Sequence, residues 1–144
     1  MKNNIVGIIK HPIKFIGLEL IFFENNPKII NKSKHDFLIV CGGGALARQY
    51  INEAKNFGII GADLDELGIR ATEINAELVA KILGAKRAKT LDEAIRANKI
   101  SVTNGLFPGV TTDFDAVVIA SLIKADAIIN ISNVKGIYDK DPFF

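Results

Sequence analysis

Three consecutive glycines, Gly42 to Gly44, form the segment of this chain best suited to holding an anion. Glycines lack Cβ atoms, so the backbone can approach a bound group closely, and the helix expected from Ala45 would direct its free N–H groups at the same place. Arg48, one turn into that helix, could add a charge-assisted hydrogen bond to a phosphate. A tight strand-to-helix turn followed by a solvated arginine explains the same residues, and both interpretations stay open at this point.

The glycine triplet differs from two common phosphate-binding fingerprints. No Lys followed by Ser or Thr comes after it, as a P-loop requires, and Ala47 occupies the position of the last glycine in Gly-x-Gly-x-x-Gly. P-loop nucleotide hydrolysis is therefore disfavoured.

A second segment, residues 104–113, brings glycines and a proline next to hydroxyl and carboxyl groups. Gly105 and Gly109 permit unusual backbone angles, and Pro108 stiffens the chain between them. The hydroxyls and carboxyl of residues 111–113 would lie at the positive end of the helix that follows. A simpler role is N-capping by Thr112 or Asp113, which we expect whether or not a ligand binds there.

Two further places carry groups that could contact a ligand. Asp65, at the head of a predicted helix, either interacts with the helix dipole or accepts hydrogen bonds from a ligand hydroxyl or base. Near the end of the chain, Ser132 and Asn133 follow a predicted strand, and the ring of Tyr138 could stack or hydrogen-bond. Asp141 precedes a proline, a pair that often forms only a turn.

Alternating strands and helices are expected to position these segments. The continuous apolar run 37–41 is typical of a strand buried on both faces of a parallel sheet. Thr90 and Glu93 form a capping box that starts a helix ending near Asn98. The other expected elements are strands at 5–9, 18–23, 100–103 and 127–131, the last one buried, helices at 45–57, 65–83 and 113–123, and a hairpin or loop at 133–142. This order predicts an α/β fold with a parallel-rich sheet between helical layers.

Composition places the chain among single-domain globular proteins. Its 144 residues are 49% hydrophobic and 24% charged, which is typical of a chain that forms a hydrophobic core. The net charge is only +2, and the sequence shows no concentration of basic residues of the kind that binds nucleic acid. Cys41 is the only cysteine and is expected to be a small buried hydrophobe, while His11 and His35 lack neighbours at metal-ligand spacing. Since no apolar run reaches the roughly 18–20 residues of a membrane helix and no signal peptide is recognisable, we expect a cytoplasmic protein that binds neither membrane nor nucleic acid.

Four motifs taken in order are more specific than any one of them. Residues 42–50 (GGGALARQY), 64–76 (LDELGIRATEINA), 107–113 (FPGVTTD) and 133–142 (NVKGIYDKDP) together resemble the amino acid kinase superfamily, and within it the archaeal type of uridylate (UMP) kinase. The resemblance covers residues 37–142 and leaves 1–36 as a divergent segment of one domain, 1–144. It implies a three-layer αβα sandwich of the carbamate kinase-like type, hexamers built from dimers, and transfer of the γ-phosphoryl of ATP, bound with Mg²⁺, onto UMP.

The resemblance also assigns roles by position, although it names no catalytic residue and no metal ligand. The residues that would contact UMP are Gly43, Asp65, Gly105, Leu106, Phe107, Pro108, Gly109, Val110 and Thr111. Those that would contact ATP are Gly44, Arg48, Ser132, Asn133, Tyr138 and Asp141.

Several features depart from the family pattern. Residues 5–12, which correspond to the first strand and glycine loop of the family, contain one glycine, Gly7, and Lys10 is an approximate substitute for the basic residue of that loop. Lys135 replaces an aspartate, and Leu106 with Phe107 replaces a more polar pair. Family chains continue beyond the motif that ends at Pro142, so we expect a C-terminally incomplete domain with its acceptor side largely intact and its donor side incomplete.

Three functions follow, and they remain alternatives here. The first is a UMP kinase that forms homo-oligomers through the 65–83 helix, on which Leu67, Ile74, Leu78 and Ile82 share an apolar face. The second is a non-catalytic nucleotide-binding or assembly module, either a truncated product or half of a split enzyme with a separate C-terminal chain. The third is another kinase of the superfamily, acting on an amino acid, carbamate or isoprenoid phosphate.

Overall fold

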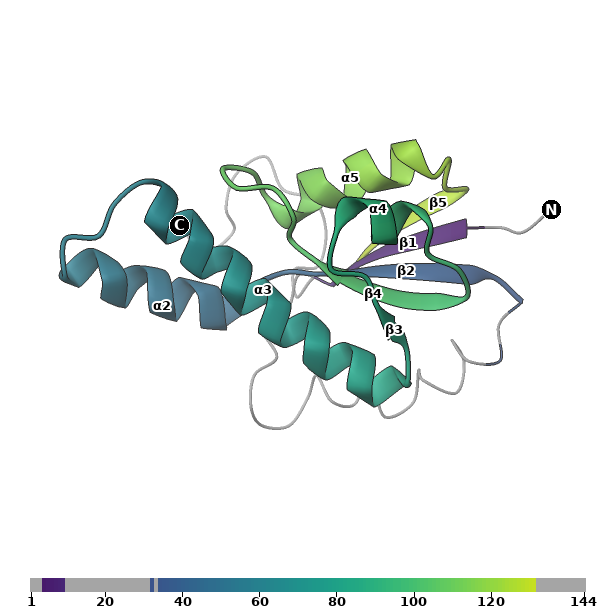
Figure 1. Ribbon diagram of the computed structural model, residues 1–144, viewed down its shortest axis with the longest axis horizontal. Coiled ribbons are helices and arrows are strands. Elements are labelled where there is room, and N and C mark those ends of the chain that lie inside the picture. Colours follow the sequence, from purple (N-terminus) through teal and green to yellow (C-terminus); the bar gives the residue numbers. More distant parts are fainter. Residues whose placement is uncertain (1–3, 10–31, 33, 132–144) are drawn as a thin grey trace.

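The computed structural model describes residues 4–9, 32 and 34–131, and from β3 (Lys86–Arg87) onward its strands and helices alternate along the chain. Five parallel strands form one sheet in the order β3-β4-β2-β1-β5 (Figure 1). The elements are β1 (Asn4–Ile9), β2 (Asp36–Cys41), α2 (Gly44–Asn56), α3 (Ala62–Leu83), β3 (Lys86–Arg87), α4 (Leu91–Ile95), β4 (Ile100–Asn104), α5 (Thr112–Leu122) and β5 (Ala127–Ile131).

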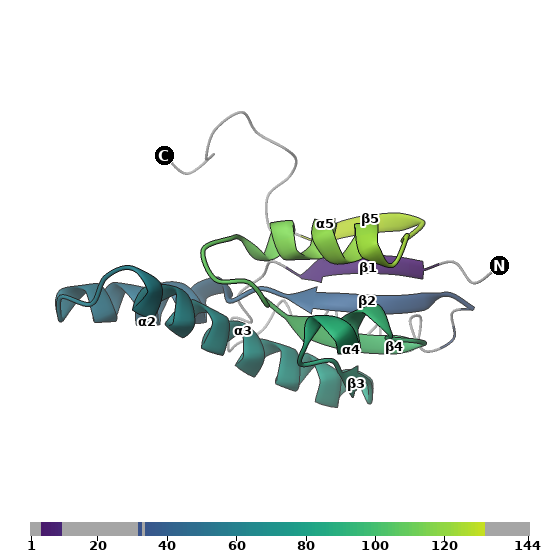
Figure 2. The same cartoon turned by 45° about the horizontal axis from the view of Figure 1, so that its top comes forward.

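Helices cover both faces of the sheet. Successive side chains of a strand point to opposite faces, so one strand can contribute to the core on each side. On β2, Leu38 and Val40 face α4 and α5, where they pack against Ile119. Ile39 and Cys41 face α3 on the other side. Figure 2 shows α5 and α3 on opposite sides of the strands. The three-layer αβα arrangement is thus confirmed, and so is the buried strand predicted from the apolar run 37–41.

The register of the sheet brings two connecting segments together. β2 and β4 are adjacent, and Cys41 is paired with Asn104 at their carboxyl ends. The glycine triplet follows β2, and the loop 105–111 follows β4, so both start from the same edge of the sheet. Ligands of open α/β sheets bind outside this carboxyl edge.

Helix α3 packs on the sheet with a different face from the one that carries Ile74 and Leu78, which was predicted to contact a second copy of the chain. Except for Leu83 near its C-terminus, its buried residues are small or polar: Ala71, Thr72, Asn75, Ala76, Val79 and Ala80. Ile74 and Leu78 are instead 59% and 38% exposed. This exposure leaves Ile74 and Leu78 available for the predicted contact between copies, although Ile82 of the same apolar face packs against the core.

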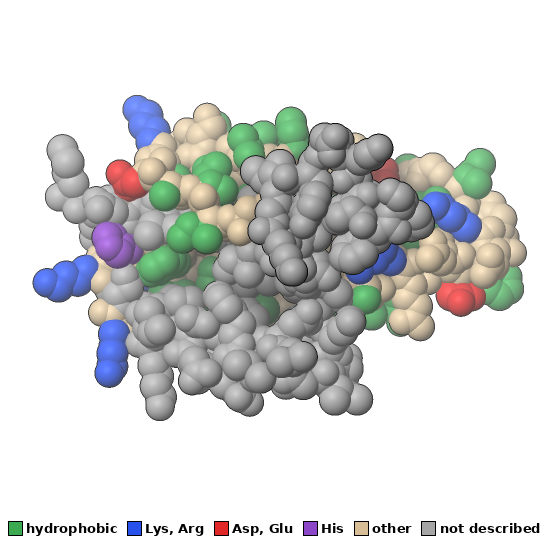
Figure 3. Space-filling view, turned by 180° about the vertical axis from the view of Figure 1, so that it is seen from behind, with side chains coloured by type: hydrophobic (Ala, Val, Ile, Leu, Met, Phe, Trp, Pro, Cys, Tyr) green, Lys and Arg blue, Asp and Glu red, His purple; other side chains and the backbone are tan. Residues whose placement is uncertain are grey.

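The hairpin of α2 and α3 extends past the sheet at one end of the molecule (Figures 1 and 2). Seen from behind, this projecting end carries hydrophobic side chains among charged ones (Figure 3). Phe57 is 84% exposed and Ile60 is 78% exposed in the connection between the two helices. Within the described residues, no helix is both long enough and apolar enough to cross a membrane.

Several predicted boundaries are wrong. Helix α3 begins at Ala62 instead of 65, just after Gly61, whose φ of 65° is not helical. The helix predicted to reach Asn98 ends at Ile95, and the edge strand β3 was not predicted. The strand 127–131 is correct in position but not buried: it forms a sheet edge, with Ile128 and Ile129 44% and 47% exposed. The segments 18–23 and 133–142 lie outside the described residues.

The N-cap of α5 is Thr111, not Thr112 or Asp113 as predicted. Thr111 has extended backbone angles, and its hydroxyl accepts a hydrogen bond from the N–H of Phe114 at 3.3 Å. Thr112 is already helical, so its side chain is no longer placed to cap the helix. By contrast, Thr90 caps α4 as predicted, accepting from the N–H of Glu93.

Candidate functional site

A cavity of about 300 Å³ lies at the carboxyl edge of β2 and β4, between the glycine triplet, the loop 105–111 and the first half of α3. Most of the residues that the sequence analysis singled out line it. They are Gly43, Gly44, Arg48, Asp65, Gly105, Phe107, Pro108, Gly109, Val110 and Thr111. Segments more than sixty residues apart in the sequence therefore meet at one place.

The glycine triplet turns directly from β2 into α2, whose N-cap Gly43 provides no side-chain cap. A Cβ on Gly43 would collide with the Cβ of Ala47, and Gly44 has a φ of 57°, in the left-handed region. Both positions consequently need glycine for a structural reason. Gly43, Gly44 and the exposed Arg48 all line the cavity at the N-terminus of α2, where N–H groups and a guanidinium favour an anion.

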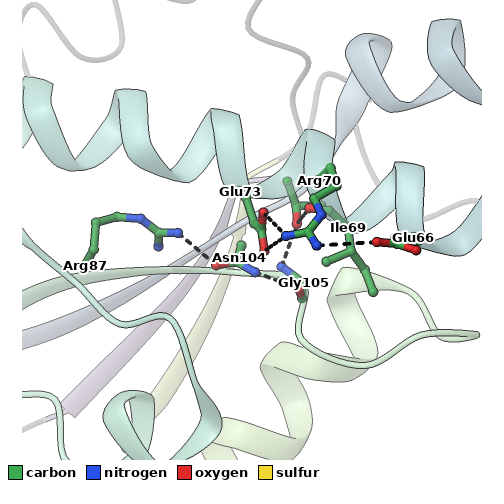
Figure 4. Close-up of polar contacts among 8 residues, drawn as sticks. Glu66, Ile69, Arg70, Glu73, Arg87, Asn104 and Gly105 are labelled. Atoms are coloured by element: carbon green, nitrogen blue, oxygen red, sulfur yellow. Dashed lines mark hydrogen bonds and ion pairs between the residues drawn. The ribbon is translucent and has the colours of Figure 1, made fainter.

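The loop 105–111 is held by hydrogen bonds at its start. The side-chain amide of Asn104 donates to the carbonyl of Gly105 at 2.8 Å, and the guanidinium of Arg87 donates to the Asn104 side-chain oxygen at 2.8 Å (Figure 4). The N–H of Gly105 donates to Thr72 Oγ1 at 3.0 Å, and the N–H of Leu106 to Asp115 Oδ2 at 2.9 Å. Three elements, β3, α3 and α5, thus fix the entry to the loop.

Asp65 lies beside the tip of the same loop. A Cβ on Gly109 would come within 3.9 Å of Asp65 Oδ2, and the φ of Gly109 is 77°. The Asp65 side chain is exposed in the first turn of α3 and lines the cavity. A carboxylate in this position can accept hydrogen bonds from hydroxyl or N–H groups of a ligand bound between the loops.

Asp115 is the buried acid of the site, with only 1% of its surface exposed. Burial raises the pKa of its carboxyl above the ordinary value of 3.8, and the N–H groups of Leu106 and Phe107 oppose that rise. Its Oδ1 is buried and has no hydrogen-bond partner among the described residues. The carboxyl therefore anchors the loop while carrying a desolvation cost whenever it is ionised.

Some predicted site residues lie elsewhere. The side chain of Leu106 packs against the core on the α4 and α5 side and does not line the cavity. Ser132, Asn133, Tyr138 and Asp141, together with Lys10, Lys135 and His11, fall outside the described residues. Sequence reasoning also overlooked Thr72, Asn75 and Asp115. For Thr72 and Asn75 the sequence offers a weak signal, polar residues at helical spacing next to Ala71 and Ala76, which does not identify the loops that they contact.

Cys41 and His35, which we expected to have packing roles and no chemical ones, both contact other parts of the protein. Cys41 is 1% exposed, and burial raises the pKa of its thiol to about 12. His35 is in edge-to-face contact with the ring of Phe37. In the part of the chain that the structure describes, no three His, Cys, Asp or Glu side chains are grouped to hold a metal ion.

A larger cavity, about 640 Å³, lies on the other side of α3 near β3, but most of the charged residues that line it already form ion pairs. Arg70 bonds to Glu73 at 3.1 Å and to Glu66 at 3.4 Å (Figure 4), and Lys81 bonds to Glu77 at 3.1 Å. It has no backbone N–H cluster comparable with the glycine triplet. The smaller cavity is thus the better candidate for a ligand.

Residues 26–143 match the sequence model of the amino acid kinase family. The chain belongs to that family. Among curated members, the uridylate kinase of Methanoregula boonei is 42% identical over 116 residues, which cover 76% of this chain and 50% of that protein. The chain spans about half the length of the curated relatives it matches.

Solved structures of the family agree with the fold. The crystal structure of uridylate kinase from Archaeoglobus fulgidus has a TM-score of 0.76 and 33% identity, covering 99% of this chain and 68% of that one. UMP kinase from Bacillus anthracis has a TM-score of 0.71 at 21% identity, over 99% of this chain and 69% of that one, a likeness that concerns the fold alone. The amino acid kinase fold inferred from the four motifs is thereby confirmed.

Proposed function

We propose that this member of the amino acid kinase family binds UMP in the cavity between the glycine triplet and the loop 105–111. We further propose that it acts as the acceptor-binding part of an ATP:UMP phosphotransferase that forms UDP. The observation that carries the proposal is the meeting of Gly43, Asp65 and the loop 105–111 around one cavity. Sequence likeness to archaeal uridylate kinases, 42% in one case, favours UMP as the acceptor over the substrates of other family members.

The geometry suits an acceptor nucleotide with an anionic end and a hydroxyl-bearing sugar. The N-terminus of α2 would hold phosphate oxygens through the backbone N–H groups of Gly43 and Gly44. Asp65 would accept hydrogen bonds from hydroxyls of the nucleotide, and Gly105 to Thr111 would enclose it from the other side. Phosphoryl transfer depends mainly on positioning and on charge stabilisation, so these groups can serve it without a covalent nucleophile.

ATP would bind next to the acceptor, with Gly44 and Arg48 on its side of the cavity. Ser132, Asn133, Tyr138 and Asp141 remain proposed ATP contacts. The Mg²⁺ ion would enter with ATP as part of that substrate and neutralise charge on its phosphates. Arg48 is exposed, lies one turn into α2 and lines the cavity, so its guanidinium could bind phosphate oxygens of ATP.

Self-association through α3 is part of the same proposal. Ile74 and Leu78 lie one turn apart on the outer face of the helix and are 59% and 38% exposed. Arg70, Glu73 and Lys81 surround them, which gives an apolar stripe with a charged border. Such a face is self-complementary if two copies pack with α3 against α3.

The purified chain with Mg-ATP and UMP, assayed for UDP, tests the enzymatic part of the proposal. AMP in place of UMP is the control for acceptor choice. UDP formation would support the kinase. UMP binding without UDP would instead support a nucleotide-binding or assembly module, the second function considered from the sequence. If the chain binds neither UMP nor ATP, both nucleotide functions are wrong.

A further inference from the structure

Two polar side chains on the inward face of α3 each contact a different loop of the cavity. Thr72 and Asn75 are 5% and 7% exposed and lie one turn apart on the helix. The hydroxyl of Thr72 bonds to the segment after β4, and the amide of Asn75 bonds to the segment after β2. The methyl group of Thr72 also lies near the glycine triplet, 3.5 Å from the place that a Cβ on Gly43 would take. One helix therefore holds both sides of the cavity.

The hydrogen bonds of Thr72 are directional. Its hydroxyl hydrogen is donated to the carbonyl of Ile69 at 2.7 Å, within α3. A hydroxyl has one hydrogen, so the oxygen lone pairs remain to accept the N–H of Gly105 at 3.0 Å. A Cβ on Gly105 would also lie 3.4 Å from Thr72 Oγ1, which shows how closely the loop approaches the helix.

Asn75 uses its amide hydrogens in a matching way. Its Nδ2 donates to the carbonyls of two consecutive residues, Gly42 at 2.7 Å and Gly43 at 3.2 Å. These peptide bonds are trans, and in a trans peptide the carbonyl and the following N–H point in opposite directions. By fixing the two carbonyls, Asn75 thus also fixes the N–H groups of Gly43 and Gly44, the donors expected to meet an anion.

We propose that Thr72 and Asn75 are positioning residues of the acceptor site, which set the separation and orientation of its two loops without contacting the phosphoryl acceptor through their own hydrogen-bonding groups. Asp65 lies on the same helix, seven residues before Thr72 and therefore on the same face. Helix α3 consequently carries the proposed ligand contact, Asp65, and also Thr72 and Asn75, which hold the two loops in position around the ligand. The inference rests on the proposed function, since it assigns the positioning to UMP binding.

The test compares Thr72→Val, which keeps the shape of the side chain and removes the hydroxyl, with Thr72→Ser, which keeps the hydroxyl. Thr103→Val is the matched control, because Thr103 is fully buried in β4 and its Oγ1 has no partner among the described residues. UMP affinity is measured by calorimetry, and amide hydrogen exchange of the segment around Gly105 by mass spectrometry. From the net value of one hydrogen bond, we expect Thr72→Val to weaken UMP binding about tenfold and to speed the exchange, with Thr72→Ser and Thr103→Val near wild type.

The two measurements separate the outcomes. Faster exchange with unchanged UMP affinity in Thr72→Val would overturn the inference, because the residue would then be structural only. Unchanged exchange would overturn it as well, since Thr72 would not be holding the loop. If the wild-type chain itself does not bind UMP, the proposed function fails and the inference falls with it, even where exchange around Gly105 responds to Thr72→Val.

Discussion

The side-chain amide of Asn75 lies 2.7 Å from the carbonyl oxygen of Gly42, a residue 33 positions earlier in the chain. This hydrogen bond joins the middle of α3 to the turn between β2 and α2. It connects the element that packs against the sheet with the backbone expected to hold an anion. The architecture of the site is thereby coupled to the packing of one helix.

Asn75→Leu is expected to lower the free energy of unfolding by about 1–3 kcal/mol, because the buried carbonyls of Gly42 and Gly43 lose their hydrogen-bond donor. Urea denaturation followed by circular dichroism measures the change. Glu53→Leu, at an exposed position of α2, is the control and should change stability by less than about 0.5 kcal/mol. An Asn75→Leu protein as stable as the wild type would contradict the contact.

Gly43→Ala should destabilise the chain and abolish UMP binding, because the new Cβ would collide with that of Ala47. The φ of −78° at Gly43 is ordinary, so the collision is the cause rather than backbone strain. Ala47→Gly in the same chain removes the obstacle and should restore folding, apart from about 0.5–1 kcal/mol for a glycine inside a helix. Thermal melts and UMP titrations of the single and double variants check this. A double variant no better than Gly43→Ala would show that the contact with Ala47 is not the reason.

The Asp115 carboxyl predicts a pH dependence of stability. Since burial raises its pKa in the folded chain, the carboxyl is neutral in both states below the ordinary value of 3.8, and stability falls as pH rises through the raised value. Asp115→Asn imitates the neutral form and can still accept from the N–H of Leu106. We expect this variant to melt at a higher temperature than the wild type at pH 7 and at an equal temperature near pH 4. A difference that grows toward acid pH would have the wrong sign.

Ile74→Glu should convert an oligomer into smaller species, because it places a charge on the exposed apolar stripe of α3. Val117→Glu is the matched control, since Val117 is 52% exposed on α5, which packs on the opposite face of the sheet. Size-exclusion chromatography with light scattering gives the masses. The same mass for both variants and the wild type would exclude this face as the contact between copies.

Much of the fold could be predicted because its signals are local. The run 37–41 is apolar at every position, which suits a strand covered on both faces, and Thr90 and Glu93 mark a helix start whatever the tertiary structure. The glycine triplet and the loop 105–111 were noticed as candidate site segments for a similar reason, since glycines between a strand and a helix indicate special backbone geometry, but their assignment to nucleotide binding came from the family resemblance.

What the sequence did not indicate depends on contacts between distant segments. A threonine and an asparagine on a helix are as common on solvated faces as on buried ones, so nothing local identifies Thr72 and Asn75 as partners of two loops. The packing face of α3 was not evident for the same reason: most of its residues are short or polar, while the larger Ile74 and Leu78 point to solvent. The exposure of β5 follows from its place at the sheet edge, which hydrophobicity alone does not give.

Calorimetric titration of UMP into the wild-type chain, Asp65→Ala and Asp63→Ala tests the central claim most directly. Both aspartates lie in the first turn of α3, but only Asp65 lines the cavity between the glycine triplet and the loop 105–111. We predict that the wild type and Asp63→Ala bind UMP with the same affinity and that Asp65→Ala binds at least about tenfold more weakly, the loss of one or two hydrogen bonds to a charged group. Equal affinity of the two variants, or no binding by the wild type, would contradict the proposed acceptor site.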